Sequence, residues 1–146
     1  MKRCFFIGHG DCRENIYPRL YESVIRHVEI YGVGEFIVGQ YGNFDHMSAR
    51  AVLQAKEKYP QIKLVLLCPY RTGVNLHLHQ GFDELFYPFD CPVPHKYAIV
   101  QANKKAISMC DYLIAYVYRI GKSKDFLEFA ERRHKKGLIS IENISL

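Results

Sequence analysis

The chain has 146 residues, of which 49% are hydrophobic and 24% charged, and its formal net charge is +5 at pH 7. This composition excludes a disordered chain, and the length predicts one domain over residues 1–146 with a sizeable core. No apolar run approaches the roughly 20 residues that cross a bilayer. The apolar part of the N-terminus, residues 4–7, is also shorter than a signal peptide requires. We therefore expect a cytoplasmic protein with no membrane partner.

The predicted elements alternate between strands and helices along the chain. Apolar runs predict strands at 4–8, 35–39, 63–68, 112–117 and 138–141, with a further short strand at 85–87. Helical spacing predicts helices at 14–31, at 43–59, from Pro94 to shortly before Asp111, and at 123–136. A strand such as 63–68, apolar on both faces, is typical of a parallel sheet covered by helices. The pattern predicts an α/β fold, a three-layer α/β/α sandwich with a mostly parallel sheet of about five strands.

Residues 69–94 interrupt this alternation with prolines, glycines and no sustained period. So long a connection in a compact domain is often a lid or binding loop. Arg71 directly follows a predicted strand, so we expect it to contact a phosphate. Aromatic and guanidinium planes could also stack on a base, and the candidates here are Tyr41, Tyr70, Arg71 and Phe82.

A metal site is not expected. The five cysteines include no C-x-x-C pair, which favours neither a disulfide framework nor a zinc ribbon. His77 and His79 could form half of a zinc site with Cys91 or His95, but no third and fourth ligands are evident. We predict no metal and no cofactor.

Three glycine turns follow predicted strands: Gly8 to Gly10, Gly39 to Gly42, and Gly121. Right-handed crossovers bring the carboxyl ends of parallel strands to one edge of the sheet, where ligands bind in such folds. A strand, a glycine turn and a helix N-terminus together also favour an anionic ligand. We expect the three turns to converge on one pocket, although glycines that only make a turn are a common alternative.

The ordered motifs resemble short bacterial members of the SLOG superfamily, which includes the Lonely Guy proteins and the DNA-processing protein A family. The resemblance rests on Cys4-Phe5-Phe6-Ile7-Gly8-His9, Gly39-x-x-Gly42-x-Phe44-Asp45, Asn103 with Ser108-x-x-Asp111-Tyr112, and Phe126-x-Glu128-x-Ala130. It covers nearly the whole chain. It implies a Rossmann-like fold with a pocket for a nucleotide or a nucleotide-derived molecule.

The resemblance also implies which residues line that pocket. Carried over by position, these are Gly8, His9, Gly39, Gly42, Asp45, Asn103 and Gly121. Two positions depart from the family pattern. Gly10 stands where an arginine is common, and Arg13 is a nearby substitute. Lys122 replaces the second glycine of the phosphate loop, where its side chain restricts backbone approach but offers a charge.

Three functions remain open from the sequence. The first is a binding module, or sensor, for a nucleotide-derived small molecule. The second is a nucleoside-phosphate N-glycosidase or transferase of Lonely Guy type, in which Glu128 or Asp45 would assist cleavage. Both carboxylates also have plain alternatives, since Asp45 can complement a helix dipole and Glu128 can be solvated. The third is a protein-interaction scaffold with a degenerate pocket.

The basic run Arg132-Arg133-His134-Lys135-Lys136 reads as a solvated helix end, where cations suit the helix dipole. No aromatic platform or recognition-helix motif accompanies it in the sequence, so we do not expect nucleic acid as a partner. Association with further copies of the chain is left open.

Overall fold

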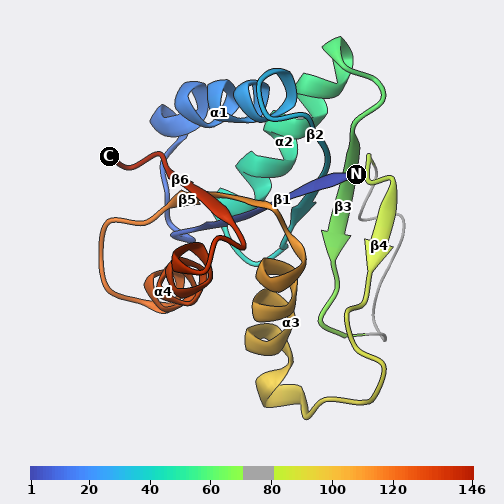
Figure 1. The fold of residues 1–146 in the computed structure, drawn as a ribbon, viewed down its shortest axis with the longest axis vertical. Coiled ribbons are helices and arrows are strands. Elements are labelled where there is room, and N and C mark those ends of the chain that lie inside the picture. Colours follow the sequence, from blue (N-terminus) through green and yellow to red (C-terminus); the bar gives the residue numbers. More distant parts are fainter. Residues whose placement is uncertain (71–80) are drawn as a thin grey trace.

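The computed structural model describes residues 1–70 and 81–146 (Figure 1). Six strands form one sheet in the order β4-β3-β2-β1-β5-β6, and every neighbouring pair is parallel. The strands are β1 (Lys2–Gly8), β2 (Val33–Val38), β3 (Lys63–Leu67), β4 (Glu84–Phe86), β5 (Tyr112–Tyr116) and β6 (Ser140–Asn143).

Four α-helices cover the two faces of this sheet, α1 and α2 on one side and α3 and α4 on the other (Figure 1). They are α1 (Tyr17–Glu29), α2 (Asn43–Lys58), α3 (His95–Met109) and α4 (Lys122–Lys135), and a short 3-10 turn, Glu14–Ile16, precedes α1. The prediction of a three-layer α/β/α sandwich is confirmed, with six strands in the described residues instead of about five. None of the helices in these residues is long and apolar enough to cross a membrane.

The four central strands are buried on both faces because each sends alternate side chains into two separate cores. In β1, Cys4 and Phe6 pack toward α1 and α2, whereas Phe5 and Ile7 pack toward α3 and α4. Strands β2, β3 and β5 divide their side chains in the same way. This two-sided burial explains why the strand sequences are continuous apolar runs without alternation.

The sheet order places a topological switch next to β1. The chain moves outward from β1 through β2 and β3 to β4, then returns to β5 on the other side of β1. In open α/β sheets a crevice forms beyond the carboxyl ends of the strands where the order reverses in this way. A crevice is therefore expected at the turn after β1 and the elements around it.

The last strand begins two residues later than its apolar pattern predicts. Gly137, with φ of 75°, ends α4, and its N–H donates to His134 O at 2.9 Å. The N–H of Leu138 donates to Arg133 O at 3.1 Å. These two bonds form a helix-capping motif that holds Leu138 outside the sheet. Consequently β6 starts at Ser140.

Candidate functional site

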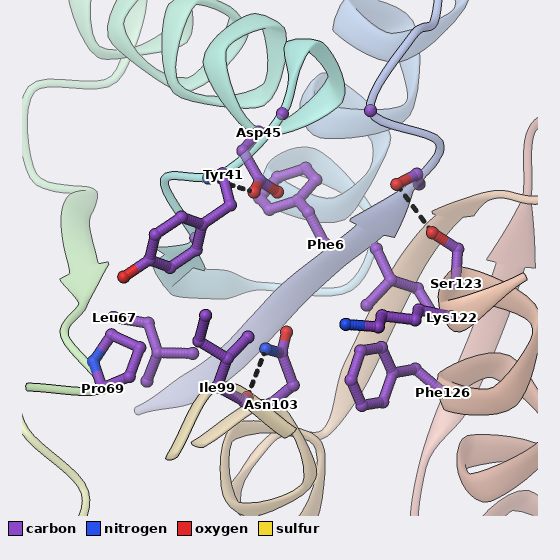
Figure 2. Close-up of a pocket in the computed structure, with 15 residues that line it drawn as sticks. Phe6, Tyr41, Asp45, Leu67, Pro69, Ile99, Asn103, Lys122, Ser123 and Phe126 are labelled. Carbon is purple, nitrogen blue, oxygen red and sulfur yellow. Dashed lines mark hydrogen bonds between the residues drawn. The ribbon is translucent and has the colours of Figure 1, made fainter. Parts of the chain in front are cut away.

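A cavity of about 260 Å³ lies at the carboxyl edge of the sheet, beside the switch point (Figure 2). Its walls come from the ends of β1 and β3, the turn after β2, the first turns of α2 and α4, and one face of α3. The polar side chains in the wall are Tyr41, Asp45, Asn103, Lys122 and Ser123. Figure 2 shows Lys122 and Phe126 of α4 on the opposite side of the cavity from Tyr41 and Pro69.

The glycines of the first two turns permit close packing of one turn against the other. A Cβ on Gly42 would lie 2.7 Å from the Cα of Gly10, and one on Gly8 would lie 2.4 Å from the ring of Phe44. The N–H of Asn43 donates to Gly10 O at 2.9 Å, which fastens the turn after β1 to the start of α2. Packing thus accounts for these glycines, and Gly8, Gly10 and Gly42 also line the cavity.

Asp45 lies in the first turn of α2 and reaches back along the chain. Its Oδ2 accepts a hydrogen bond from the N–H of Tyr41 at 3.1 Å, so the carboxylate closes the turn before the helix. A Cβ on Gly39 would lie only 2.9 Å from this same oxygen. Burial among these atoms raises the pKa of Asp45 to about 6, although the Tyr41 hydrogen bond opposes the shift. The carboxyl therefore changes charge close to neutral pH while it borders the cavity.

The first turn of α4 forms the opposite wall. Gly121, with φ of 152°, stands immediately before the helix, and Lys122 and Ser123 line the cavity. Ser123 Oγ donates to Gly8 O at 2.8 Å, which ties this helix start to the end of β1. Lys122 forms no ion pair within the described residues. Together with the free N–H groups of a helix N-terminus, this ammonium favours an anion.

His9 does not line the cavity, and it supports the loop that leads to it. The imidazole is buried, and its Nε2 accepts a hydrogen bond from the N–H of Tyr118 at 3.1 Å. Burial, and then the charge of Arg119, lower the pKa of His9. The neutral ring thus fixes the start of the segment between β5 and α4. A contact between His9 and a ligand remains a prediction.

The other predicted residues divide between the cavity and its surroundings. Asn103 donates from Nδ2 to Ile99 O at 2.8 Å, and its amide oxygen faces the cavity in Figure 2. Glu128 is exposed on α4 outside the cavity wall, so a catalytic role for it stays an untested prediction without geometric support. Arg13 is exposed and also lies outside the wall. Gly121 does not line the cavity, whereas the next residue, Lys122, does.

The predictions for the long connection are resolved in part. Arg71, His77 and His79 lie outside the described residues. Tyr70 stacks on His95 with ring centroids 4.3 Å apart, and Phe82 packs against the core beside α1 and α2; neither lines the cavity. Within residues 1–70 and 81–146 no three metal-ligating side chains gather at one place.

Ser123 and Phe126 of α4 are among the wall residues that were not predicted to contact a ligand. Residues 122 and 126 are four apart and share one face of α4. Helical spacing counted from Lys122 would have indicated Phe126. Ser123 carried no signal because its partner, the carbonyl of Gly8, is remote in the sequence.

A solved structure of DNA processing protein A from Helicobacter pylori is similar to this chain, with a TM-score of 0.57 and 13% sequence identity. The match covers 98% of this chain and 76% of that one. This chain has a Rossmann-like α/β/α fold. A scan against models of known families finds no match, and a search among curated proteins finds none at the significance required.

The comparison corrects one expectation drawn from the sequence. The Helicobacter pylori protein has a single-stranded DNA binding mode. The expectation that nucleic acid is not a partner is therefore wrong, because a protein with a similar fold binds single-stranded DNA. It rested on the absence of an aromatic platform near the basic run, although Phe129 lies on the same helix with Arg132 beside its ring.

Proposed function

We propose that this chain binds a nucleotide or nucleotide-derived small molecule in the cavity at the carboxyl edge of the sheet. The observation that carries the proposal is the meeting of two helix starts, those of α2 and α4, around one cavity at the switch point of the sheet. Helix N-termini and a lysine suit a phosphate, and a concave wall with few polar groups suits a small organic ligand.

The wall offers a different chemistry at each end. Lys122 and the N–H groups of the first α4 turn would hold the phosphate. Asp45 and the amide oxygen of Asn103 would accept hydrogen bonds from sugar hydroxyls. Leu67, Pro69 and Ile99 present an apolar surface for a base. This division predicts that both the phosphate and the nucleoside contribute to binding.

We further propose that the chain is a short bacterial member of the SLOG superfamily. The ordered motifs of the sequence support this assignment, and so does the shared fold with a DNA processing protein A. The replacement of the second loop glycine by Lys122 is compatible with the proposal because the lysine supplies charge where a glycine would supply backbone access.

An N-glycosidase is the second candidate, and one observation favours it. Asp45, with a pKa of about 6, borders the cavity and can exchange a proton near neutral pH. Glu128, the carboxylate that the resemblance implies, is exposed outside the wall. An enzyme of this type would therefore depend on Asp45, and Glu128→Gln would retain its activity.

Calorimetric titration with a panel of ribonucleoside and deoxyribonucleoside monophosphates tests the proposal, and chromatography of the same mixtures detects any released base. We expect binding by at least one nucleotide, weakened tenfold or more by Lys122→Ala. Lys124→Ala is the matched control, since Lys124 is exposed on the same helix turn and lies outside the wall. Binding without base release supports the module, and base release lost in Asp45→Asn supports the enzyme. No binding to any nucleotide rejects both and leaves the scaffold.

A further inference from the structure

We propose that the outer surface of α3 and α4 binds a single strand of nucleic acid, at a place separate from the cavity. A groove of about 700 Å³ runs between residues 88–94 and α3. A second hollow, of about 390 Å³, lies on α4. Phe129 belongs to both, so the two are continuous. We call them together the basic groove. The proposal does not rest on the proposed function of the cavity.

The two helices present matching faces to this groove. On α3 the lining positions include 97, 101, 104, 105 and 108. On α4 they are 129, 132, 133 and 135, and residue 136 follows directly after the helix. Spacings of three and four residues put most of these side chains on one side of each helix. Arg133 joins the two helices, because its Nη2 donates to Ser108 O at 3.2 Å. The groove is thus a continuous surface shared by both helices.

Positive charge is concentrated and unpaired in the basic groove. Its lining includes Lys104, Lys105, Arg132, Arg133, Lys135 and Lys136. None of these six forms an ion pair within the described residues, whereas seven other basic side chains do. Asp90 is the one carboxylate in the lining, and Glu128 and Glu131 of α4 lie outside it. An extended polyanion complements this surface.

Aromatic rings lie among these cations, which favours a strand with accessible bases over other polyanions. Tyr97 is 50% exposed, and Lys96 Nζ lies 5.0 Å from its ring centroid. The ring of Phe129 has Lys104 Nζ at 5.7 Å and Arg132 Cζ at 5.9 Å from its centroid. Surfaces that bind single strands combine cations for the phosphates with rings on which bases stack. A duplex keeps its bases stacked inside, and an acidic protein segment has no bases to stack on the rings.

The test measures fluorescence anisotropy of a labelled twelve-residue oligothymidylate with the full chain at about 0.15 M salt, where screening limits long-range effects of charge. The surface variant is Arg132→Gln/Lys135→Gln/Lys136→Gln. The control variant, Arg13→Gln/Arg50→Gln/Lys58→Gln, removes the same charge on the side of α1 and α2. We expect at least tenfold weaker binding for the surface variant only. For the surface variant, the slope of log affinity against log salt concentration should be shallower by up to about 2, because each lost phosphate contact removes about 0.7 from that slope. Thermal melts check that both variants fold.

A second pair of measurements tests the role of the rings. Tyr97→Ala should weaken binding to oligothymidylate about fivefold or more, because a stacked base contributes on the order of 1–3 kcal/mol. The same substitution should not change binding to an abasic strand with the same number of phosphates. Equal affinity of the wild type for the abasic strand, for polyglutamate or for a duplex overturns the proposal. Equal loss in the two charge variants also overturns it.

The outcome is separable from that of the proposed function. Lys122→Ala should leave oligothymidylate binding unchanged, and an excess of nucleoside monophosphate should not displace the strand. Displacement of the strand by a mononucleotide, together with loss in Lys122→Ala, would place strand binding in the cavity and overturn the proposal for the basic groove.

Discussion

Gly39 leaves free the space beside the Asp45 carboxylate: a Cβ on Gly39 would lie 2.9 Å from Asp45 Oδ2, the oxygen that accepts a hydrogen bond from the N–H of Tyr41. The missing side chain of one residue therefore makes room for the carboxylate of the other. Because Asp45 belongs to the cavity wall, a glycine in the turn after β2 acts on the site through its neighbour.

This contact predicts the effect of Gly39→Ala. The added methyl group should displace the Asp45 carboxylate and break its bond to Tyr41, at a cost of about 1–2 kcal/mol in the free energy of unfolding. Nucleotide binding should weaken at the same time. Gly34→Ala is the control, since a Cβ there meets only the flexible Met1 side chain at 3.0 Å. Chemical denaturation and calorimetry measure the two effects, and equal behaviour of the two variants would contradict the assigned contact.

Two glycines that touch each other should differ in their tolerance of a side chain. A Cβ on Gly42 would lie 2.7 Å from the backbone of Gly10, whereas one on Gly10 would lie 3.7 Å from Gly42, an ordinary contact. We expect Gly42→Ala to lower the free energy of unfolding by roughly 2–3 kcal/mol, as overpacking against backbone does. Gly10→Ala should lower it by less than about 1 kcal/mol. Urea unfolding of both variants measures the difference, and a reversed order would show that the turns pack in another way.

The raised pKa of Asp45 predicts a pH dependence of stability. The folded-state pKa of about 6 exceeds the usual 3.8, so the fold favours the protonated carboxyl. This contribution is fully present below about pH 4 and is lost as pH rises through about 6. Asp45→Asn should therefore change the free energy of unfolding, relative to the wild type, more favourably at pH 8 than at pH 4. The pKa difference alone accounts for up to about 3 kcal/mol between the two pH values.

Asp125→Asn, at an exposed carboxylate in the first turn of α4, is the control for Asp45→Asn. Unfolding free energies of both variants and the wild type across pH 4–8 give the comparison. A wild-type profile unchanged by Asp45→Asn would show that Asp45 titrates at an ordinary pKa.

His9 should act in the opposite direction. Its pKa is lowered in the folded state, so the neutral ring is favoured and stability falls as pH drops through the ordinary value of about 6.5. His9→Ala should loosen residues 117–121 because the N–H of Tyr118 loses its acceptor. His9→Gln, which keeps an acceptor at a similar reach, should restore protection of that amide and reduce the pH dependence.

Hydrogen exchange at Tyr118 and unfolding measured between pH 5 and 8 test the His9 variants. Part of the acid-side loss should persist in both, because buried His27 also has a lowered pKa. Unchanged exchange at Tyr118 in His9→Ala would contradict the role of His9 as the support of the loop. An undiminished pH dependence in His9→Gln would contradict its lowered pKa.

The layers of the fold were predictable from the sequence because burial of a strand or helix determines the local spacing of its apolar residues. Each of the four central strands alternates between two cores, and each helix carries one apolar face, so continuous runs and helical spacing locate both. The start of β6 was not predictable in this way. Leu138 looks like a strand residue, and the capping bonds at Gly137 withdraw it from the sheet.

The turn pattern located part of the candidate site: Gly8, Gly39 and Gly42, in turns after parallel strands, line the cavity. Asp45, Asn103 and Lys122 also line it, and these were indicated by the resemblance. Ser123 and the rings of the basic groove were missed because their neighbours come from other elements. Phe129 gains Lys104 as a neighbour only when α3 packs beside α4, and no local spacing records that contact.

The most direct test of the account is an NMR titration of the backbone amides with the nucleotide that binds best in calorimetry. We expect the amides of residues 8–10, 39–45 and 121–123 to shift together and to saturate with a single affinity, while those of α1 remain unchanged. Lys122→Ala should weaken that affinity at all three segments. Shifts confined to one segment, or centred on another surface of the molecule, would contradict a nucleotide site at the carboxyl edge of the sheet.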